Sequence, residues 1–595
     1  MAHGESGRPR GAWAWISFLA ASAVMVGCPP PGLSLTDVTP SPAAPGDIIT
    51  LTGGAFGANQ GASAVLYDGS PLPIFSWSDT QILAALPNPK PSGFYDVAVQ
   101  VGGVTSNSVE HRICPTAGCP FEVHHVTYTV NPQNILGGFV DFHTDVPAVP
   151  SVSVDGPEGS FTVPLTGILS ASPGTSHHVG VLGLRQATSY TIRVKATDPG
   201  TLDETPEVAV PHTTGSVDPD KFPLMLLTVD PVRMQSGYTF FRASSPTASG
   251  GFSRLYALDG EGQLVWYDES GAAPEEVFRL ANGNLLYNTA GNSVEEIDMF
   301  GDTIRTITNV SMGTDTIHHE LTPLPNGNYL TLSTELRTIG GYPLGLTFDV
   351  VGDVIVEFTS DGVVVDEWST FDHLDPYRIH FGWDSETWWS TYHPFVKDWT
   401  HGNGVIYDAS DDTMIVSLRH QDIVYKLTRA HPEQLVWVMG QDEPATTGDD
   451  AWPFLTLVGP GKYPNHQHAP ELLPNGHILM YDNANNVQIT RAVEYAIDPG
   501  ALTMTQEWEW VDPDYTPPLF ARFVGDVDLQ PNGNVLIFDG GLERQPDLTN
   551  PISLRISEVT RDTSEKVFEA WMYAEDLAYV GYRAVRLPTL YPPEP

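Results

Sequence analysis

Basic residues and cysteines are both scarce in this chain of 595 residues. The 28 Lys and Arg residues face 72 Asp and Glu residues, which gives a formal net charge of −44. Such a surface repels phosphate backbones and anionic lipid head groups, which argues against nucleic acid as a partner. The three cysteines are too few for a zinc site built from thiolates. An anionic substrate would therefore need a local cationic pocket inside this negative field.

The apolar stretch near the N-terminus, AWAWISFLAASAVMVGC, is too short to span a membrane. Arg8 and Arg10 precede it and small residues end it, which is the pattern of an export signal. VMVGC approximates a bacterial lipobox, so we expect residues 1–28 to be a signal peptide with lipid attachment at Cys28; ordinary secretion is the alternative. The expected location is extracytoplasmic, either as a periplasmic or cell-surface lipoprotein tethered to the membrane or as a secreted protein.

The overall composition indicates folded, β-rich protein. Hydrophobic residues make up 41% of the chain and charged residues only 17%, which excludes general disorder. The 55 glycines and 51 prolines predict many turns. The two remaining cysteines, Cys114 and Cys119 in CPTAGC, could close a small structural disulfide loop after export. At this length a few domains are expected.

Two β-sandwich domains are predicted before residue 222. Residues 33–113 contain short alternating runs with turn residues between them, and ITLTGGAFG, VLYDG and GFYDVAVQVGGVTSNS resemble an IPT/TIG domain, an immunoglobulin-like sandwich. Residues 120–215 give a second set of strands. Within it LRQATSYTIRVKA is similar to the closing half of a fibronectin-type sandwich, in which the tyrosine packs at a corner. We expect both domains to be spacers or docking modules rather than catalytic.

From residue 222 to residue 595 a short phrase recurs. RLANGNLLYN, PLPNGNYLTLS, LLPNGHILMYDN and LQPNGNVLIFDGG each place Asn-Gly before an alternating strand, and DASDDTMIVSLR is a degenerate copy. Asn-Gly predicts a tight hairpin because both residues tolerate a positive φ. A recurring hairpin with two more strands per unit predicts a β-propeller of four-stranded blades, and we expect six blades of about sixty residues each. The predicted fold class is therefore all-β, a six-bladed propeller preceded by two immunoglobulin-like or fibronectin-like sandwiches.

Histidines occupy the same phase in two copies of this repeat. His319 and His468 each lie eight residues before the glycine of the next turn, and Gly525 holds that place in a third copy. Equal phase in a repeat predicts an equal place in the structure. If the hairpin joins the first two strands of a blade, these positions begin the innermost strand, and the imidazoles converge at one mouth of a central channel. His401 takes a similar place in the degenerate copy.

Converging imidazoles have three explanations: hydrogen-bonded pore residues, a metal site, or nucleophilic and acid-base chemistry. No carboxylate or thiolate recurs at this phase apart from Glu320 and Asp526. Arg419, in VSLRHQD, puts a cation on the strand after the His401 hairpin. A guanidinium beside several imidazoles is poor for binding a metal cation and good for holding an oxyanion. The pattern favours chemistry on an anion, with no bound metal.

The stretches that carry this pattern resemble the bacterial arylsulfotransferase (aryl-sulfate sulfotransferase) family over about residues 220–595. The most specific is DWTHGNGVIYDASDDTMIVSLRHQDIVYKL, beside HHELTPLPNGNYLTL, HQHAPELLPNGHILMYDN and GDVDLQPNGNVLIFDGG. The resemblance implies a six-bladed propeller that transfers sulfuryl groups from an aryl sulfate donor to a phenolic acceptor. It also implies a sulfurylated histidine intermediate, no nucleotide sulfate donor and no cofactor.

Carried over by motif, His468 would be the nucleophile. His401 and Arg419 would be catalytic partners, and Asn403 would bind substrate. His319 would supply the remaining catalytic imidazole because its phase matches that of His468.

His318, the neighbour of His319, is the alternative and would otherwise contact substrate. The chain departs from the family in having no cysteine in the propeller region, two sandwich domains, and a second candidate nucleophile, His466.

These residues allow a ping-pong reaction. His468 attacks sulfur, and a neighbouring imidazole protonates the departing phenolate and later deprotonates the acceptor phenol. Trp388, Trp389, Tyr392 and Phe395 could form an aryl pocket or pack within a blade. The rival functions are an aryl sulfate hydrolase on the same scaffold and a non-catalytic cell-surface binding propeller. A homo-oligomer is compatible with either.

Overall fold

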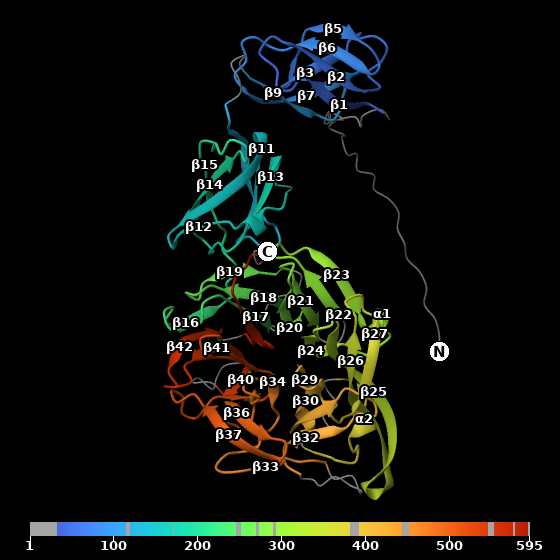
Figure 1. Cartoon of the computed structure of the whole chain (residues 1–595), viewed down its shortest axis with the longest axis vertical. Helices are drawn as coiled ribbons and strands as arrows, with labels where there is room; N and C mark the ends of the chain where they lie inside the picture. The colour runs from blue at the N-terminus through green and yellow to red at the C-terminus, as the bar shows by residue number, and fades with distance from the viewer. Residues whose placement is uncertain are drawn as a thin grey trace, which may run out of the picture. The chain divides into compact units, whose positions relative to one another are not determined.

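The computed structural model of the chain is nearly all β, as the sequence predicts (Figure 1). It describes residues 32–114, 120–170, 172–245, 251–268, 273–289, 293–380, 389, 392–442, 452–544, 552–574 and 577–592. Cys28 with the rest of the expected signal peptide lies outside the described residues, and so does Cys119. Cys114 is disulfide-bonded. Within the described ranges, no helix has the length and apolar character needed to cross a membrane.

The chain divides into two compact units, Met1–His124 and His125–Pro595. The first unit holds two antiparallel sheets with the strand orders β1-β2-β6-β5 and β4-β3-β7-β8, and β9 also pairs with β7. The strands are β1 (Ser34–Thr39), β2 (Ile48–Gly54), β3 (Ala64–Tyr67), β4 (Ser70–Pro71), β5 (Ile74–Trp77), β6 (Gln81–Ala85), β7 (Gly93–Val101), β8 (Val104–Thr105) and β9 (Val109–Ile113). Alternate residues point into the core between them, so that Ile49 and Leu51 of β2 are fully buried with Val97 and Val99 of β7.

The second unit begins with a six-stranded sheet of order β10-β11-β14-β15, on which β12 and β13 also pair with β11. Its strands are β10 (Val123–Val130), β11 (Gly138–Gly156), β12 (Gly159–Thr162), β13 (Gly174–Val181), β14 (Ser189–Thr197) and β15 (Val208–Thr213), with the short turn η1 (Leu165–Gly167). Tyr190 is buried, and its hydroxyl accepts the backbone N–H of Arg185 at 2.8 Å and donates to Glu158 at 2.9 Å. This is the corner that the fibronectin-like pattern predicts.

Six further sheets, antiparallel except for two short parallel pairs, follow in the described part of the chain. Three are β16-β42-β41-β40-β38 with β39 on β40, β19-β18-β17-β43, and β20-β21-β22-β23. Their strands are β16 (Leu224–Val229), β17 (Tyr238–Ser245), β18 (Phe252–Leu258), β19 (Leu264–Tyr267), β20 (Pro274–Arg279), β21 (Leu285–Thr289), β22 (Ser293–Ile297), β23 (Thr303–Thr308), β38 (Phe520–Ala521), β39 (Asp526–Leu529), β40 (Val535–Arg544), β41 (Ser553–Val559), β42 (Lys566–Met572) and β43 (Ala584–Leu587).

The other three sheets are β24-β25-β26-β27 with β28 on β26, β29-β30-β31-β32, and β33-β37-β36-β35-β34. Their strands are β24 (His318–Pro323), β25 (Tyr329–Tyr342), β26 (Leu346–Phe358), β27 (Val364–Ser369), β28 (Lys397–Asp398), β29 (Gly402–Asp408), β30 (Thr413–Leu418), β31 (Ile423–Thr428), β32 (Leu435–Met439), β33 (Thr456–Leu457), β34 (His468–Leu472), β35 (Ile478–Asp482), β36 (Arg491–Asp498) and β37 (Thr503–Trp510). The short helices and turns between them are α1 (Asn309–Met312), α2 (Thr370–His373), η2 (Pro343–Gly345) and η4 (Arg419–Gln421).

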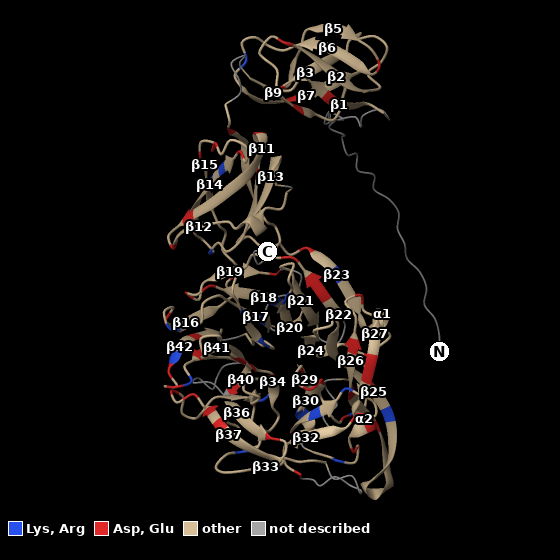
Figure 2. Ribbon diagram, in the orientation of Figure 1, with Lys and Arg blue, Asp and Glu red and all other residues tan. Residues whose placement is uncertain are grey.

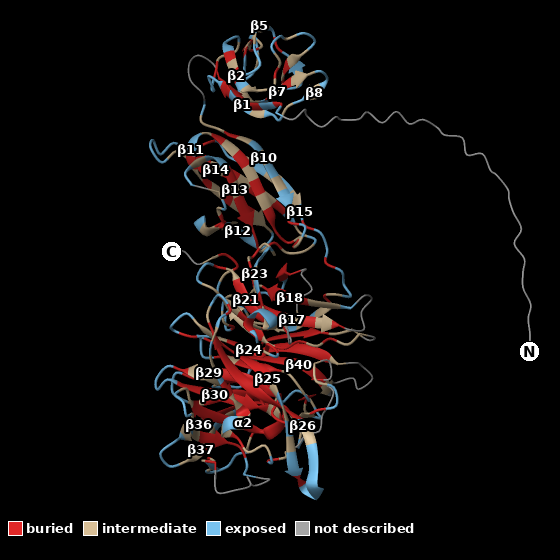
Figure 3. Ribbon diagram, turned by 90° about the vertical axis from the view of Figure 1, so that its right-hand side faces the viewer, coloured by how far each residue is buried: buried red, intermediate tan, exposed pale blue. Residues whose placement is uncertain are grey.

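The two ends of this region share sheets. The early strand β16 pairs with the late strand β42, and the last strand β43 pairs with the early strand β17. Buried residues fill the middle of the sheets, whereas the far end of the β25–β26 hairpin is exposed, with Leu344 at 97% exposure (Figure 3). Acidic residues are spread over strands and loops, with far fewer basic ones among them (Figure 2).

The Asn-Gly phrases join the first and second strands of their sheets, as the repeat predicts. The turn itself differs from the prediction, because only the glycine has a positive φ, for example 86° at Gly327. Asn326 instead accepts the backbone N–H of Asn328 with its side chain at 3.0 Å, and the N–H of Gly327 donates to the backbone oxygen of Leu324 at 3.0 Å. The asparagine is therefore selected for its side-chain hydrogen bond rather than for a left-handed backbone.

The first strands of successive sheets lie against one another. β20 contacts β24, β24 contacts β29, β29 contacts β34, and β34 contacts β39. Hydrogen bonds cross these contacts: the Thr322 hydroxyl donates to the backbone oxygen of Val405 at 2.6 Å, and Leu529 donates its N–H to Glu471 at 2.8 Å. Residues that begin these strands are therefore brought close together from distant parts of the sequence.

Candidate active site

The predicted site residues lie at or near the beginnings of first strands in three neighbouring sheets. They are, in chain order, His318, His319, His401, Asn403, Arg419 and His468. The first two begin β24, the next two stand just before and within β29, and the last begins β34, while the arginine lies in η4 directly after β30. Every one of the four histidines is at least nine-tenths buried, and the asparagine is fully buried.

Three imidazoles follow one another in contact, in the order His318, His319 and His401. His318 and His319 share a hydrogen bond between their Nδ1 atoms at 2.7 Å, and the ring centroids of His319 and His401 are 5.3 Å apart. The backbone N–H of His319 donates to the Glu275 carboxylate at 2.5 Å. The ring of Tyr582 lies 5.4 Å from that of His319, and its buried hydroxyl has no hydrogen-bond partner among the described residues.

His468 is held in one tautomer by its neighbours. Its Nδ1 lies 2.6 Å from Oδ1 of Asn483 and 3.1 Å from the backbone oxygen of His466. The amide nitrogen of Asn483 donates to the backbone oxygens of Ala521 and Val524, which fixes Oδ1 as the acceptor. The proton of His468 therefore sits on Nδ1, and Nε2 carries the lone pair, which accepts the Val524 N–H at 3.3 Å.

The pKa values of His319, His401 and His468 all lie well below the ordinary value, chiefly because burial disfavours the charged imidazolium. For His401 and His468 the positive charge of Arg419 is the next cause, and for His319 it is the charges of the other histidines. These pKa shifts keep the imidazoles neutral at neutral pH. The charge of Arg419 thus contributes to the pKa shifts of two of them.

Arg419 is a half-buried cation held on both sides. Its Nη1 donates to Nε2 of His420 at 2.9 Å, and its Nη2 donates to the backbone oxygen of Arg522 at 3.0 Å. Its own backbone N–H donates to the backbone oxygen of His401 at 3.1 Å, which ties η4 to the start of β29. Burial lowers the pKa of Arg419 to about 10, so it stays charged at neutral pH, and its buried Nε has no partner among the described residues. A fixed donor with unused capacity suits an incoming oxyanion.

Asp398 contacts two imidazoles at once. Its Oδ2 accepts Nδ1–H of His401 at 2.6 Å and lies 3.6 Å from Nδ1 of His420, which hydrogen-bonds the Asp398 backbone oxygen at 2.9 Å. The rings of His401 and His420 stack with centroids 4.6 Å apart. Among the described residues these three side chains alone have the spacing of a metal site. The Arg419 guanidinium on His420 is a repulsive neighbour for a cation, so the donor set fits hydrogen bonding better than a metal.

His466, the second candidate nucleophile, has another partner. Its Nδ1 lies 2.8 Å from Oδ1 of Asp422, and its backbone N–H donates to the same oxygen at 2.6 Å. The other oxygen of Asp422 lies 2.8 Å from Nδ1 of His380. His466 is thus tied to the Asp422 carboxylate, which it shares with His380.

The backbone is strained where the site residues lie. His319 has a φ of 61°, His401 one of 49°, Ala469 one of 45° and Val524 one of 55°, all in the left-handed region that L-residues with a side chain rarely adopt. Such residues cost of order 1–3 kcal/mol each and persist only when their surroundings impose them. Such a cluster of strained residues around one group of imidazoles is typical of functional sites.

Close packing between first strands depends on glycine in HGNG. A Cβ on Gly404 would lie 2.8 Å from Cδ of Pro470, so the glycine lets β29 approach β34. That approach allows Nδ2 of Asn403 to donate to the backbone oxygen of Gln467 at 2.7 Å, next to His468. Oδ1 of Asn403 is buried and has no partner among the described residues.

Of the four aromatic residues considered for an aryl pocket, Trp389 lies against the imidazoles. It is buried, with its ring centroid 4.8 Å from that of His318 and 6.2 Å from that of His401. Tyr392 packs on Trp389, whereas Phe395 is 88% exposed. Trp388 lies outside the described residues.

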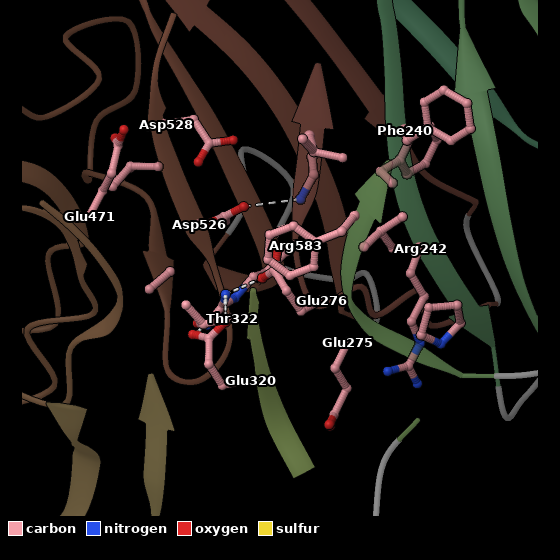
Figure 4. Close-up of a pocket in the computed structure, with 18 of the residues that line it drawn as sticks. Phe240, Arg242, Glu275, Glu276, Glu320, Thr322, Glu471, Asp526, Asp528 and Arg583 are labelled. Atoms are coloured by element: carbon pink, nitrogen blue, oxygen red, sulfur yellow. Dashed lines mark hydrogen bonds and ion pairs between the residues drawn. The ribbon is translucent and has the colours of Figure 1, made fainter. Parts of the chain in front are cut away.

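A cavity of about 270 Å³ lies along the same first strands, beyond the imidazoles (Figure 4). Its charged and polar lining includes Arg242, Glu275, Glu276, Glu320, Thr322, Glu471, Asp526, Asp528 and Arg583. Arg583 donates to Glu276, to both oxygens of Glu320 and to the backbone oxygen of Asn403. Burial raises the pKa of Glu276 to about 8 and that of Asp526 to about 6. Glu276 is therefore largely protonated at neutral pH, and its neighbour Arg583 is already paired with Glu320, so Arg419 is the better placed cation for an anion.

Sequence reasoning missed four residues with direct contacts in the site: Asp398, His420, Asn483 and Tyr582. The first two stand in the quoted motif, and Asp398 is three residues before His401, a spacing that brings their side chains within 2.6 Å. Asn483 is 15 residues after His468. No repeat or motif signal marks Tyr582, because its approach depends on the pairing of the last strand, β43, with β17.

The fold and the site together define a class: an all-β protein with several buried, neutral imidazoles and a fixed guanidinium between neighbouring sheets. Such a site is suited to chemistry on an anionic group. The arylsulfotransferase (ASST) family model matches residues 226–583, more than half of the chain, and the chain belongs to this family. The IPT/TIG domain model matches residues 33–113, which confirms the resemblance read from the sequence.

Two curated relatives carry the name arylsulfate sulfotransferase AssT. The protein of Escherichia coli O6:H1 is 24% identical over 368 residues, covering 52% of this chain and 58% of its own. The protein of Lelliottia amnigena is 22% identical over 293 residues, covering 40% of this chain and 48% of its own. The chain thus spans about half the length of the curated relatives that it matches.

Among solved structures, the periplasmic gluconolactonase of Pseudomonas aeruginosa covers 57% of this chain and 99% of its own at 12% identity, with a TM-score of 0.29. That score is too low to carry an argument about the fold.

Proposed function

We propose that the protein transfers a sulfuryl group from an aryl sulfate donor to a phenolic acceptor through a sulfurylated His468, without a nucleotide sulfate donor. The observation that carries this proposal is the state of His468: it is buried and neutral, its proton is fixed on Nδ1, and its Nε2 faces the Val524 N–H at 3.3 Å, a contact that an incoming sulfur would displace. The charge of Arg419 lowers the pKa of His468 further. A neutral imidazole next to a fixed cation is what attack on an anionic ester needs. Family membership and the names of the relatives support the same reaction.

In the first half of the reaction, Nε2 of His468 forms a bond to sulfur as the bond from sulfur to the aryl oxygen breaks. The electron pair of the broken bond stays on the aryl oxygen, which takes a proton from His401 or His319 after that imidazole, neutral at rest, has been protonated from solvent. Arg419, with its unused Nε, holds the sulfuryl oxygens. Removing one such preorganised donor from comparable sites costs about 3–4 kcal/mol of barrier.

In the second half, the acceptor phenol gives its proton back to the same imidazole. Its oxygen attacks sulfur, the bond from Nε2 of His468 to sulfur breaks, and the electron pair returns to Nε2. The enzyme thus ends the cycle with the protons that it had at the start. The ring of Trp389 beside His318 offers an aromatic wall for the aryl group.

We further propose that the six sheets of this region are the blades of a six-bladed propeller. Contacts between the first strands of successive sheets support this arrangement, since first strands line the axis of a propeller. The sharing of two sheets between the ends of the region supports closure of the ring. On this arrangement the imidazoles lie at one end of the axis, above the charged cavity of Figure 4.

The test is to mix the protein with an aryl sulfate, quench rapidly and map the added SO3 by mass spectrometry. We expect the SO3 on the peptide that contains His468, and we expect His468→Ala to abolish both the adduct and transfer. An adduct on another peptide, or full turnover by His468→Ala, would contradict the proposal. Release of inorganic sulfate at the same rate with and without a phenol would favour the hydrolase instead.

A further inference from the structure

The Asp398 carboxylate is 1% exposed and lies behind the reacting groups, on the far nitrogen of His401. A hydrogen bond of 2.6 Å joins its Oδ2 to Nδ1 of His401. Because a carboxylate can only accept, the proton of neutral His401 sits on Nδ1. This assigns proton exchange between His401 and a substrate to the opposite nitrogen, Nε2.

The other two imidazoles that could exchange protons are held differently. Both nitrogens of His420 are engaged, Nδ1 by the Asp398 backbone oxygen at 2.9 Å and Nε2 by Arg419 at 2.9 Å. Nδ1 of His319 shares its hydrogen bond with Nδ1 of His318 at 2.7 Å, and Nε2 of His318 lies 3.3 Å from Oδ1 of Asp353, so a carboxylate acts on Nδ1 of His319 only through a second imidazole. Among these imidazoles, His401 is the one whose Nδ1 rests directly on a carboxylate.

A carboxylate in that place decides whether His401 can serve as an acid. To protonate a departing phenolate His401 must first become an imidazolium, which burial and the Arg419 charge both oppose. Asp398 provides negative charge in direct contact with it. The other groups that face Asp398 are His420, Trp389 and the charges of Arg419 and Asp353. Of these, only Asp353 adds negative charge.

We propose that Asp398 is the positioning residue that makes His401, rather than His319, the proton donor to the departing phenolate and the proton acceptor from the incoming phenol. The proposal rests on the sulfuryl transfer proposed above. In the first half-reaction the proton moves from Nε2 of His401 to the aryl oxygen as the bond from sulfur to that oxygen breaks. In the second half-reaction the acceptor phenol returns a proton to Nε2 of His401. Throughout the cycle, Nδ1–H of His401 keeps its hydrogen bond to Asp398.

The leaving group tests this assignment. A 4-nitrophenolate departs readily without a proton, whereas phenolate, being far more basic, needs one. In single-turnover labelling of His468 we expect Asp398→Asn to slow reaction with phenyl sulfate by about 100- to 1,000-fold, within the range that general acid catalysis contributes. With 4-nitrophenyl sulfate we expect a loss of less than about tenfold. His401→Gln is expected to show the same contrast.

Asp422→Asn is the matched control, because Asp422 is a buried carboxylate at 2.8 Å from another imidazole, His466. Any loss in this variant is expected to be equal for the two donors. Folding of each variant is checked by circular dichroism and thermal melting.

Equal losses for both donors in Asp398→Asn, with His468 still labelled, would overturn the role of Asp398 and leave the transferase intact. If Asp398→Asn does not fold, His401→Gln decides: an unchanged ratio between the donors would overturn the proposal. No label on His468 in the unaltered protein would instead mean that the proposed function has failed.

Discussion

His468 combines properties that a free histidine in water does not have together. Burial keeps it neutral, Asn483 holds its proton on Nδ1, and Val524 approaches Nε2 through a backbone N–H at 3.3 Å. A free imidazole exchanges tautomers and is partly protonated near neutral pH. The protein therefore fixes in advance both the protonation state and the nitrogen that would attack.

This state has a consequence for the pH dependence of attack. The pKa of His468 lies well below its ordinary value of 6.5, so the nucleophile stays neutral as the pH falls through 6.5. We expect the rate of SO3 labelling by 4-nitrophenyl sulfate, a donor with little need of an acid, to change less than about twofold between pH 7.5 and 5.5. A histidine with an ordinary pKa would lose about tenfold over the same range. Rapid-quench labelling across this range measures it, and a decline with an apparent pKa of 6.5 or above would contradict the expectation.

The site residues that the sequence pattern predicts differ in kind from those that it misses. His319 and His468 share a phase with a repeated turn, so their positions follow from periodicity alone. Asp398 and Asn483 each act through one hydrogen bond to a catalytic histidine, and neither residue recurs in the repeated phrase. Their roles depend on distances of 2.6 Å that only folded coordinates supply.

At the scale of elements, the strands and their hairpins follow from alternation and from Asn-Gly turns. The turn type does not follow from them, because the asparagine side chain accepts a hydrogen bond from a backbone N–H of its own turn and its φ is not positive. The pairing of strands that lie far apart in the sequence could not be predicted either. The pairing of β16 with β42 joins residues more than three hundred positions apart, and alternation says nothing about which strand meets which.

Gly525 stands directly before β39, at the same phase as His319 and His468, and here a side chain is absent for a steric reason. Its φ is 124°, and a Cβ on it would lie 2.2 Å from the buried ring of Tyr481. We expect Gly525→Ala to lose about 1–2 kcal/mol of folding free energy from backbone strain. Overpacking against Tyr481 is expected to add about 1–3 kcal/mol. Because the neighbouring Val524 N–H contacts His468, transfer activity is expected to fall as well.

Gly533 provides the matched control for this element. Its φ is 87°, but a Cβ there would meet nothing within 4 Å. Gly533→Ala is therefore expected to lose only the strain contribution and to keep its activity. Denaturant melts and initial rates compare the two variants, and equal destabilisation of both would mean that contact with Tyr481 does not matter.

At the scale of the whole molecule, the net charge of −44 works against the proposed anionic donor, whereas Arg419 attracts it only at short range. The Debye length, over which the field of the surface charges decays, is about 30 Å at 0.01 M salt and about 8 Å at 0.15 M. Salt screens a partly buried cation such as Arg419 much less. Capture of the donor should therefore become easier as salt is added, which is the reverse of ordinary electrostatic steering.

We expect kcat/KM for an anionic aryl sulfate to rise by about two- to tenfold between roughly 0.01 M and 0.15 M sodium chloride, the range over which steering effects change. The kcat/KM for an uncharged phenol acceptor is expected to stay constant, and in a ping-pong reaction the two are measured independently. Chloride is used because sulfate would compete for Arg419. If kcat/KM for the donor falls with salt, the potential at the mouth of the site is positive despite the net charge, and the donor is then drawn in by local cations such as Arg522, which is 58% exposed along its side chain.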